Sequence, residues 1–161
     1  MKPSVLLVDD DGEFTDLIKF NLERQNCIIR VAPNGAEGLR MAIEETPDVV
    51  LLDLMLPDIP GLLLCRILNQ RPSTRDIPIF ILSALVPSWF ENARHARFSR
   101  FFQKPVGMKI LTESIIAVCS QKTKDAPNGA QPPQEPTPKE PNGVAHSPAS
   151  ASPSAKRDAV Q

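Results

Sequence analysis

Short apolar runs recur along the chain, and the segments between them place apolar residues three or four positions apart. The runs are too short for ordinary helices and rich in aliphatic residues, which is typical of parallel strands buried on both faces. The predicted strands cover residues 4–8, 27–32, 49–53, 78–82 and 100–103. The spacing between them predicts helices that begin after Gly12 and after Asn34, and three more over residues 62–70, 87–96 and 108–120.

This alternation of strands and helices predicts the fold class. It indicates an α/β domain, with a doubly wound five-stranded parallel sheet and helices on both faces. At this length the expected strand order is the flavodoxin-like 2-1-3-4-5. In such a sheet the carboxyl ends of the strands surround a crevice in which ligands bind.

Composition divides the chain near Ser120. Residues 121–161 are rich in Pro, Ala, Ser and Gln, and their only branched aliphatic residues are Val144 and Val160. Such a segment cannot bury enough apolar surface to offset the entropy that is lost on ordering. We therefore expect a folded domain over residues 1–120 and a disordered tail over 121–161.

Charge and cysteine usage disfavour several classes of protein. The formal net charge is -1, which argues against direct binding of nucleic acid. The three cysteines lie far apart in the sequence and suggest neither a disulfide framework nor a zinc site. No apolar run approaches the ~20 residues of a membrane-spanning helix. We expect a cytoplasmic protein without membrane insertion.

Polar residues end four of the predicted strands. Asp9, Asp10 and Asp11 follow the first strand, Asp53 ends the third, Ser83 follows the fourth and Lys104 the fifth. Carboxylates that are brought together repel one another, and a hard divalent cation such as Mg²⁺ relieves the repulsion. A carboxylate can also accept a phosphoryl group as a nucleophile. The pattern predicts Asp53 as a phosphoacceptor and Mg²⁺ as a cofactor, bound by Asp53 together with Asp9 or Asp10.

Each of these signals has a plainer interpretation when it is taken alone. The three consecutive acids could be an N-cap cluster for the following helix, a position that the helix dipole favours. Ser83 alone is typical of a turn, and Lys104 alone is typical of a solvated surface. Their predicted convergence around Asp53 favours the functional interpretation.

Four motifs together resemble the receiver domain of two-component response regulators. They are Val8 to Asp11, Asp53 to Gly61, Ser83-Ala84 and Lys104-Pro105. The resemblance covers about residues 4–119. It implies a signalling protein, not an enzyme, that is phosphorylated on Asp53 by a sensor histidine kinase or a phosphotransfer protein. Because the expected tail supplies no output domain, we expect a stand-alone regulator that signals by protein contact.

The same resemblance implies a role for each site residue. Asp9 and Asp10 would form the acidic pair, with Asp10 the more direct Mg²⁺ ligand. The backbone carbonyl of Met55 would be a further ligand. Ser83 and Lys104 would contact the phosphoryl group, and the bond from Lys104 to the following proline would be cis.

Two residues would carry the response to phosphorylation. Ser83 would move toward the phosphate, and the aromatic ring of Phe101 would turn inward.

Met55 and Leu85 would lie beside the water that hydrolyses the phosphoryl group. Because both side chains are apolar and cannot orient that water, we expect slow self-dephosphorylation.

The segment from Trp89 to Phe102 departs from the family. Arg97 and Phe98 stand where receivers usually carry a Gly-Ala pair. Aromatic and arginine residues are favoured anchors of protein interfaces, so we expect a downstream protein target to bind this face. Core aromatic residues with solvated arginines are the alternative. A homodimer formed on phosphorylation is also left open.

Three other functions compete with this one. A pseudo-receiver would bind proteins without being phosphorylated, but the intact acids, Ser83 and Lys104 disfavour it. A phosphatase with an aspartyl nucleophile would carry a second acid where this chain has Met55. The tail could act as a proline-rich ligand, since Pro133 and Pro136 give a PxxP spacing, although such matches are common by chance.

Overall fold

The computed structural model describes residues 2–84 and 96–125, and this part of the chain contains five strands and four helices. The strands are β1 (Ser4–Val8), β2 (Ile28–Ala32), β3 (Val49–Asp53), β4 (Ile79–Ser83) and β5 (Arg100–Gln103). The helices are α1 (Gly12–Arg24), α2 (Gly35–Glu45), α3 (Gly61–Gln70) and α4 (Met108–Asp125). The helix predicted over 87–96 lies almost wholly outside the described residues.

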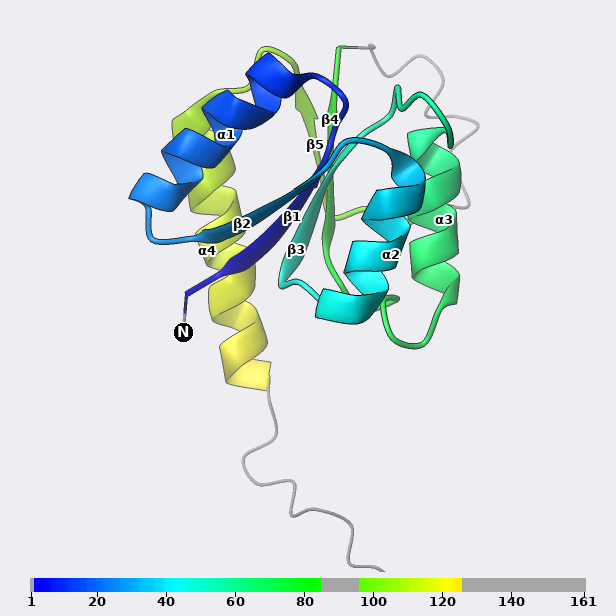
Figure 1. The fold of residues 1–161 in the computed structure, drawn as a ribbon. Helices are drawn as coiled ribbons and strands as arrows, with labels where there is room; N and C mark the ends of the chain where they lie inside the picture. The colour runs from blue at the N-terminus through cyan, green and yellow to red at the C-terminus, as the bar shows by residue number, and fades with distance from the viewer. Residues whose placement is uncertain (1, 85–95, 126–161) are drawn as a thin grey trace, which may run out of the picture. The chain divides into compact units, whose positions relative to one another are not determined.

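All five strands are parallel and form one sheet in the order β2-β1-β3-β4-β5. The predicted fold class and strand order are confirmed. In the register, Val8 pairs with Leu52, and Asp53 pairs with Leu82. Because the strands run in the same direction, their carboxyl ends lie at one edge, where the loops after β1 and β3 leave the sheet (Figure 1).

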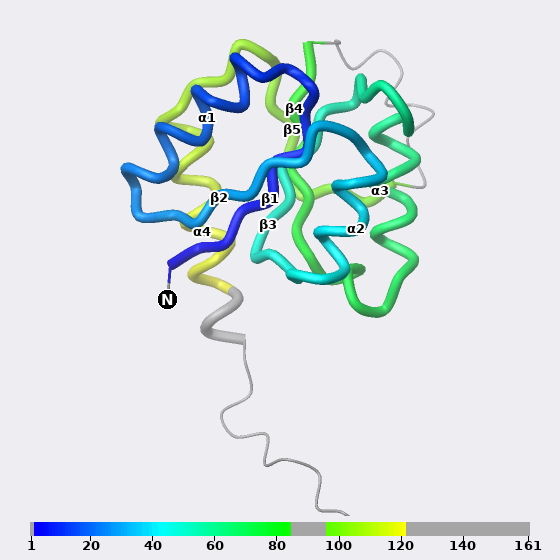
Figure 2. Tube along the Cα trace, viewed as in Figure 1, coloured from blue at the N-terminus to red at the C-terminus, as the bar shows by residue number. Residues whose placement is uncertain are grey.

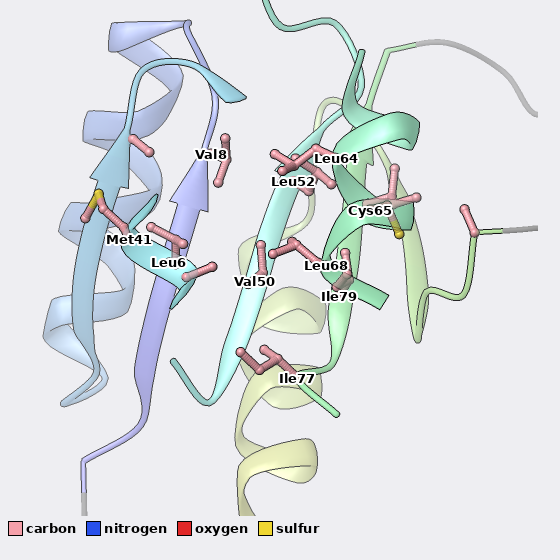
Figure 3. Close-up of a cluster of buried hydrophobic side chains, with 14 of the residues drawn as sticks. Leu6, Val8, Met41, Val50, Leu52, Leu64, Cys65, Leu68, Ile77 and Ile79 are labelled. Atoms are coloured by element: carbon pink, nitrogen blue, oxygen red, sulfur yellow. The ribbon is translucent and has the colours of Figure 1, made fainter. Parts of the chain in front are cut away.

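The sheet separates two apolar cores, because successive side chains of a strand point to opposite faces. Helices α2 and α3 cover one face, and α1 and α4 cover the other (Figure 1). On the α2–α3 face, Leu6 and Val50 of the strands belong to one cluster with Met41 of α2 and Leu68 of α3. In Figure 3, Leu6 lies beside Met41 and Val50 beside Leu68. The core on the opposite face contains Val5, Leu7, Ile18, Leu22, Leu51, Phe80, Leu111 and Ile115. Burial on both faces explains why the central strands β1, β3 and β4 are almost continuously apolar, whereas the edge strands β2 and β5 are partly exposed.

Helix α2 ends where the sequence predicts. Thr46 precedes Pro47 and leaves the helical conformation, with φ 43° and ψ 65°. At the start of the helix, the side chain of Asn34 accepts a hydrogen bond from the N–H of Glu37 at 2.9 Å. The cap and the proline together fix the length of α2.

Helix α4 runs to Asp125, past Ser120, where we expected the folded domain to end. The added residues favour or tolerate a helix, and the next proline is Pro127. Residues 126–161 lie outside the described part of the chain, so the disordered tail stays a prediction. Among the helices of residues 2–84 and 96–125, none combines the length and the apolar character that crossing a membrane requires.

Candidate functional site

The carboxyl ends of β1 and β3 bring three acidic side chains together. Carboxylate oxygens of Asp9, Asp10 and Asp53 lie within 4.8 Å of one another. Figure 2 shows the reason, since the chain turns from β1 into α1 and from β3 toward α3 at the same edge of the sheet. The acidic cluster that the strand ends predicted is therefore present.

The three consecutive acids after β1 have different surroundings. Asp9 is 1% exposed, and its Oδ1 accepts a hydrogen bond from the N–H of Asp11 at 3.1 Å. Asp11 is the N-cap of α1, since its Oδ1 accepts from the N–H of Phe14 at 3.1 Å. Asp10 is exposed and joins the acidic cluster. The N-cap interpretation therefore applies to Asp11, while Asp9 and Asp10 belong to the acidic cluster.

Lys104 supplies a cation to this cluster. Its ammonium donates to Oδ2 of Asp9 at 2.6 Å and lies 3.3 Å from Oδ2 of Asp53. Its backbone N–H donates to the carbonyl of Ser83 at 2.9 Å, which joins the end of β5 to the end of β4. The bond between Lys104 and Pro105 is cis, as predicted. Because only 17% of the Lys104 side chain is exposed, a solvated surface lysine is excluded.

Burial dominates the electrostatics of Asp9. It raises the pKa of Asp9 above the ordinary value, and the negative charge of Asp53 adds to the rise. The ammonium of Lys104 and the N–H of Asp11 offset part of it. A hard divalent cation would relieve the same repulsion, and the three carboxylates of the cluster are the oxygen donors that Mg²⁺ prefers. The residues present therefore fit a magnesium site.

Asp53 ends β3 with its side chain fixed at both oxygens. It is 7% exposed, and its Oδ1 accepts from the N–H of Leu54 at 2.6 Å.

Helix α3 begins at Gly61, next to the end of β3. A Cβ at Gly61 would lie 2.1 Å from the carbonyl oxygen of Asp53 and 2.6 Å from the Cα of Leu54. A glycine is therefore required where the helix meets the strand.

Asp58 is a loop residue whose contribution sequence reasoning missed. Its carboxylate accepts from the N–H groups of Gly35 at 2.7 Å and Ala36 at 2.8 Å, at the start of α2. It also accepts from the N–H of Ile59 at 2.8 Å. Partial desolvation acts to raise the pKa of Asp58, but these backbone hydrogen bonds outweigh it and lower the pKa. The loop after β3 is thereby attached to α2. The only available signal was an aspartate in a proline-flanked loop, where Asp commonly bonds to backbone N–H groups.

The remaining predicted residues lie around the same edge of the sheet or on its last strand. Ser83 ends β4, is fully buried and pairs with Gln103 in the register. Met55 follows β3 in the loop and is 63% exposed. Phe101 lies on β5, half-buried against the α2–α3 core. Their roles in metal binding and switching stay predictions, and Leu85 lies outside the described residues.

Comparison with known proteins points to one family. The profile of the response regulator receiver domain matches residues 5–116. The chain belongs to the response regulator receiver family. Members of this family are signalling phosphoacceptors of two-component systems, and they bind Mg²⁺ at an acidic pocket.

Two curated relatives illustrate the extent of the receiver match. The DNA-binding dual master transcriptional regulator RpaA of Synechocystis is 39% identical over 83 residues, which are 52% of this chain and 34% of that protein. An uncharacterized 14.6 kDa protein of Leptolyngbya boryana is 29% identical over 123 residues, which are 76% of this chain and 94% of that protein. This chain therefore spans about a third of the length of RpaA.

Solved structures agree with the receiver fold. The receiver domain of the Francisella response regulator 1452 has a TM-score of 0.68 to this chain at 27% identity. The match covers 75% of this chain and 99% of that domain. A CheY-like receiver domain protein from Methanospirillum hungatei, at 23% identity, has a TM-score of 0.72, with 78% of this chain and 100% of that chain covered. This second likeness shows the fold alone.

The face that departs from the family is described only in part. Residues 89–95, which include the predicted anchors Trp89 and Arg94, lie outside the described residues. Phe98 packs against the α2–α3 core, and Phe102 packs against the core on the opposite face. Arg97 and Arg100 are exposed. The half-buried aromatic residues and the exposed arginines are compatible with both interpretations, so the interface role stays a prediction.

Proposed function

We propose that this receiver domain accepts a phosphoryl group on Asp53 from the phosphohistidine of a sensor histidine kinase or of a phosphotransfer protein. The observation that carries the proposal is the position of the Lys104 ammonium, 2.6 Å from Asp9 and 3.3 Å from Asp53. It puts a positive charge beside the carboxylate that would attack phosphorus. Membership of the receiver family supports the same assignment.

In the proposed reaction, an oxygen of Asp53 forms a bond to phosphorus while the bond from phosphorus to the donor imidazole nitrogen breaks. The electron pair of that bond leaves with the imidazole. Lys104 would neutralise charge on the phosphoryl oxygens, and the hydroxyl of Ser83 would donate to another of them. The N–H of Leu54 already fixes the orientation of the attacking carboxylate.

Asp9, Asp10 and Asp53 would hold Mg²⁺, with the backbone carbonyl of Met55 as a further ligand. When bound, Mg²⁺ supplies positive charge to the phosphoryl oxygens. The clustering of three carboxylates supports this assignment, because a cation relieves the repulsion between them. Burial is the main cause of the raised pKa of Asp9, and the charge of Asp53 adds to it, which is the part that a bound cation would offset.

Phosphorylation would then be communicated by protein contact. Ser83 and Phe101 would carry the change from the site toward the face formed by residues 89–102, where a downstream protein or a second copy of the chain would bind. Slow self-dephosphorylation, a stand-alone arrangement and a cytoplasmic location remain predictions beside this proposal.

Incubation with acetyl phosphate and Mg²⁺, followed by intact-mass measurement, tests the proposal. The wild-type protein should gain the mass of one phosphoryl group, and Asp53→Ala should gain none. Asp16→Ala, which removes an exposed carboxylate of α1, should gain mass as the wild type does. No gain in the wild type, with acetyl phosphate or with a phosphohistidine donor, would favour a protein-binding module that works without phosphorylation.

A further inference from the structure

An aromatic ring is the third partner of the Lys104 ammonium. The Nζ atom lies 4.2 Å from the centroid of the Phe14 ring, inside the range of a cation–π contact. The same atom contacts the carboxylates of Asp9 and Asp53. Neither the proposed chemistry nor the acidic cluster uses Phe14.

The backbone holds Phe14 at this position. Phe14 lies in the first turn of α1, and its N–H donates to the capping carboxylate of Asp11 at 3.1 Å. Its half-buried side chain packs against the core on the α1–α4 face. Asp11 in turn donates its own N–H to Asp9. The ring and the carboxylate that both contact Lys104 are therefore linked through one capped turn.

The ring of Phe14 attracts the ammonium of Lys104, which an aliphatic side chain cannot do. A lysine side chain has several rotatable bonds, so its ammonium can move between two neighbouring carboxylates. The negative face of an aromatic ring attracts a cation, and the attraction increases where water is partly excluded, as it is around a side chain that is 17% exposed. A leucine could fill the same space, but it would not attract the ammonium.

We propose that Phe14 is a positioning residue for Lys104, whose ring face holds the ammonium beside Asp53 and thereby increases the rate at which Asp53 takes up a phosphoryl group. This inference rests on the proposed function and adds a residue to its site. It concerns the orientation of Lys104 and requires no contact between Phe14 and the phosphoryl donor.

Fluorination tests the inference without changing the packing. Each fluorine weakens the negative face of the ring but hardly alters its shape. With mono-, di- and trifluorophenylalanine at position 14, the rate of phosphorylation by acetyl phosphate should fall step by step, to about two- to fivefold below wild type for trifluorophenylalanine. The thermal unfolding midpoint should fall by only a few degrees through the series, because the same contact also stabilises the folded state. Phe14→Leu should be as slow as the trifluoro variant.

Phe20 provides a matched control on the same helix. Its ring also contacts a cation, with Cζ of Arg24 at 5.4 Å from the ring centroid, and it is 58% exposed. Fluorination at Phe20 should leave the rate unchanged. In a Lys104→Met background, fluorination at Phe14 should have no further effect. The inference would be overturned if fluorination at Phe14 left the phosphorylation rate unchanged, or if it lowered the rate equally in the Lys104→Met background. The proposed function would not be affected by either outcome.

Nuclear magnetic resonance gives a readout that does not depend on phosphorylation. The ring current of Phe14 should move the ε-proton signals of Lys104 upfield, and Phe14→Leu should return them to the range of exposed lysines. Unchanged Lys104 signals in Phe14→Leu would overturn the inference. A wild-type protein that takes up no phosphoryl group would instead overturn the proposed function, and with it the effect of Phe14 on the rate.

Discussion

Helices α1 and α3 both begin on a glycine beside the acidic cluster, but the two glycines have different surroundings. A Cβ at Gly12 would have nothing within 4 Å beyond its own helix and chain neighbours. A Cβ at Gly61 would lie 2.1 Å from the carbonyl oxygen of Asp53. Helix α1 is capped by the side chain of Asp11, whereas Pro60 gives α3 no side-chain cap.

The comparison shows two ways of attaching a helix to a functional strand end. The β1–α1 half of the site is held by charged and polar side chains, whose contacts can weaken gradually. The β3–α3 half is held by backbone atoms in direct contact, and backbone atoms have little room to move in a packed structure. Substitutions should therefore have graded effects in the first half and large steric effects in the second.

Gly61→Ala should have the largest effect on stability. The new methyl group would displace α3 or the end of β3, and we expect a loss of about 3 kcal/mol in the free energy of unfolding. Urea denaturation measures it. Gly12→Ala is the matched control, because there is space for its methyl group and alanine favours a helix. Equal stability of Gly61→Ala and Gly12→Ala would show that the two helix starts do not differ.

Lys104→Met should have the next largest effect. It leaves the carboxylates of Asp9 and Asp53 close together without their cation. In the absence of Mg²⁺ we expect the free energy of unfolding to fall by about 2 kcal/mol, which is less than the loss on breaking a fully buried ion pair. Mg²⁺ should raise the unfolding midpoint of the variant more than that of the wild type, because the ion replaces the missing charge.

Thermal unfolding with and without Mg²⁺ measures this difference, and Lys109→Met removes an exposed lysine for comparison. If Mg²⁺ raised the midpoints of Lys104→Met and wild type by the same amount, the acids would not share a site with the ion.

Asp11→Ala should have a smaller effect. It removes the N-cap of α1 and should lower the free energy of unfolding by about 1 kcal/mol. Asp11→Ser keeps a capping oxygen and should recover most of the loss. Urea denaturation of both variants measures the difference. A loss that serine did not recover would indicate that the charge of Asp11 matters more than its hydrogen bond to Phe14.

Asp58→Asn should have the smallest effect, visible mainly through pH. The folded-state pKa of Asp58 is lowered below the ordinary value of 3.8, so its carboxylate stabilises the fold above that pH. This contribution is lost as the pH falls through the folded-state pKa. The difference in unfolding free energy between wild type and Asp58→Asn should therefore be constant at neutral pH and shrink in acid. Asp16→Asn, at an exposed position of α1, should show no such shrinkage.

The sequence alone determined the architecture and the composition of the acidic cluster. Aliphatic runs and helical spacing are local patterns, and they predicted the strands within a residue at each end. The signal was clearest for the central strands β1, β3 and β4, because burial on both faces requires apolar residues there. The parallel topology then brought Asp9, Asp10 and Asp53 to one edge, since all carboxyl ends of such a sheet lie together. The end of α4 was harder to predict, because five polar residues after Ser120 continue the helix.

Only the tertiary structure decided how each acid is used. Nothing in the run Asp9-Asp10-Asp11 shows which acid caps α1 and which one binds Lys104, because the two positions lie only two residues apart in sequence and differ in their surroundings in space. The contact between Asp9 and Lys104 joins residues 95 positions apart, and Asp58 reaches Gly35 across 23 positions. The contact between the Phe14 ring and Lys104 also joins residues that lie far apart in the sequence. Such contacts depend on how the helices pack on the sheet, and this packing depends on all the core residues together.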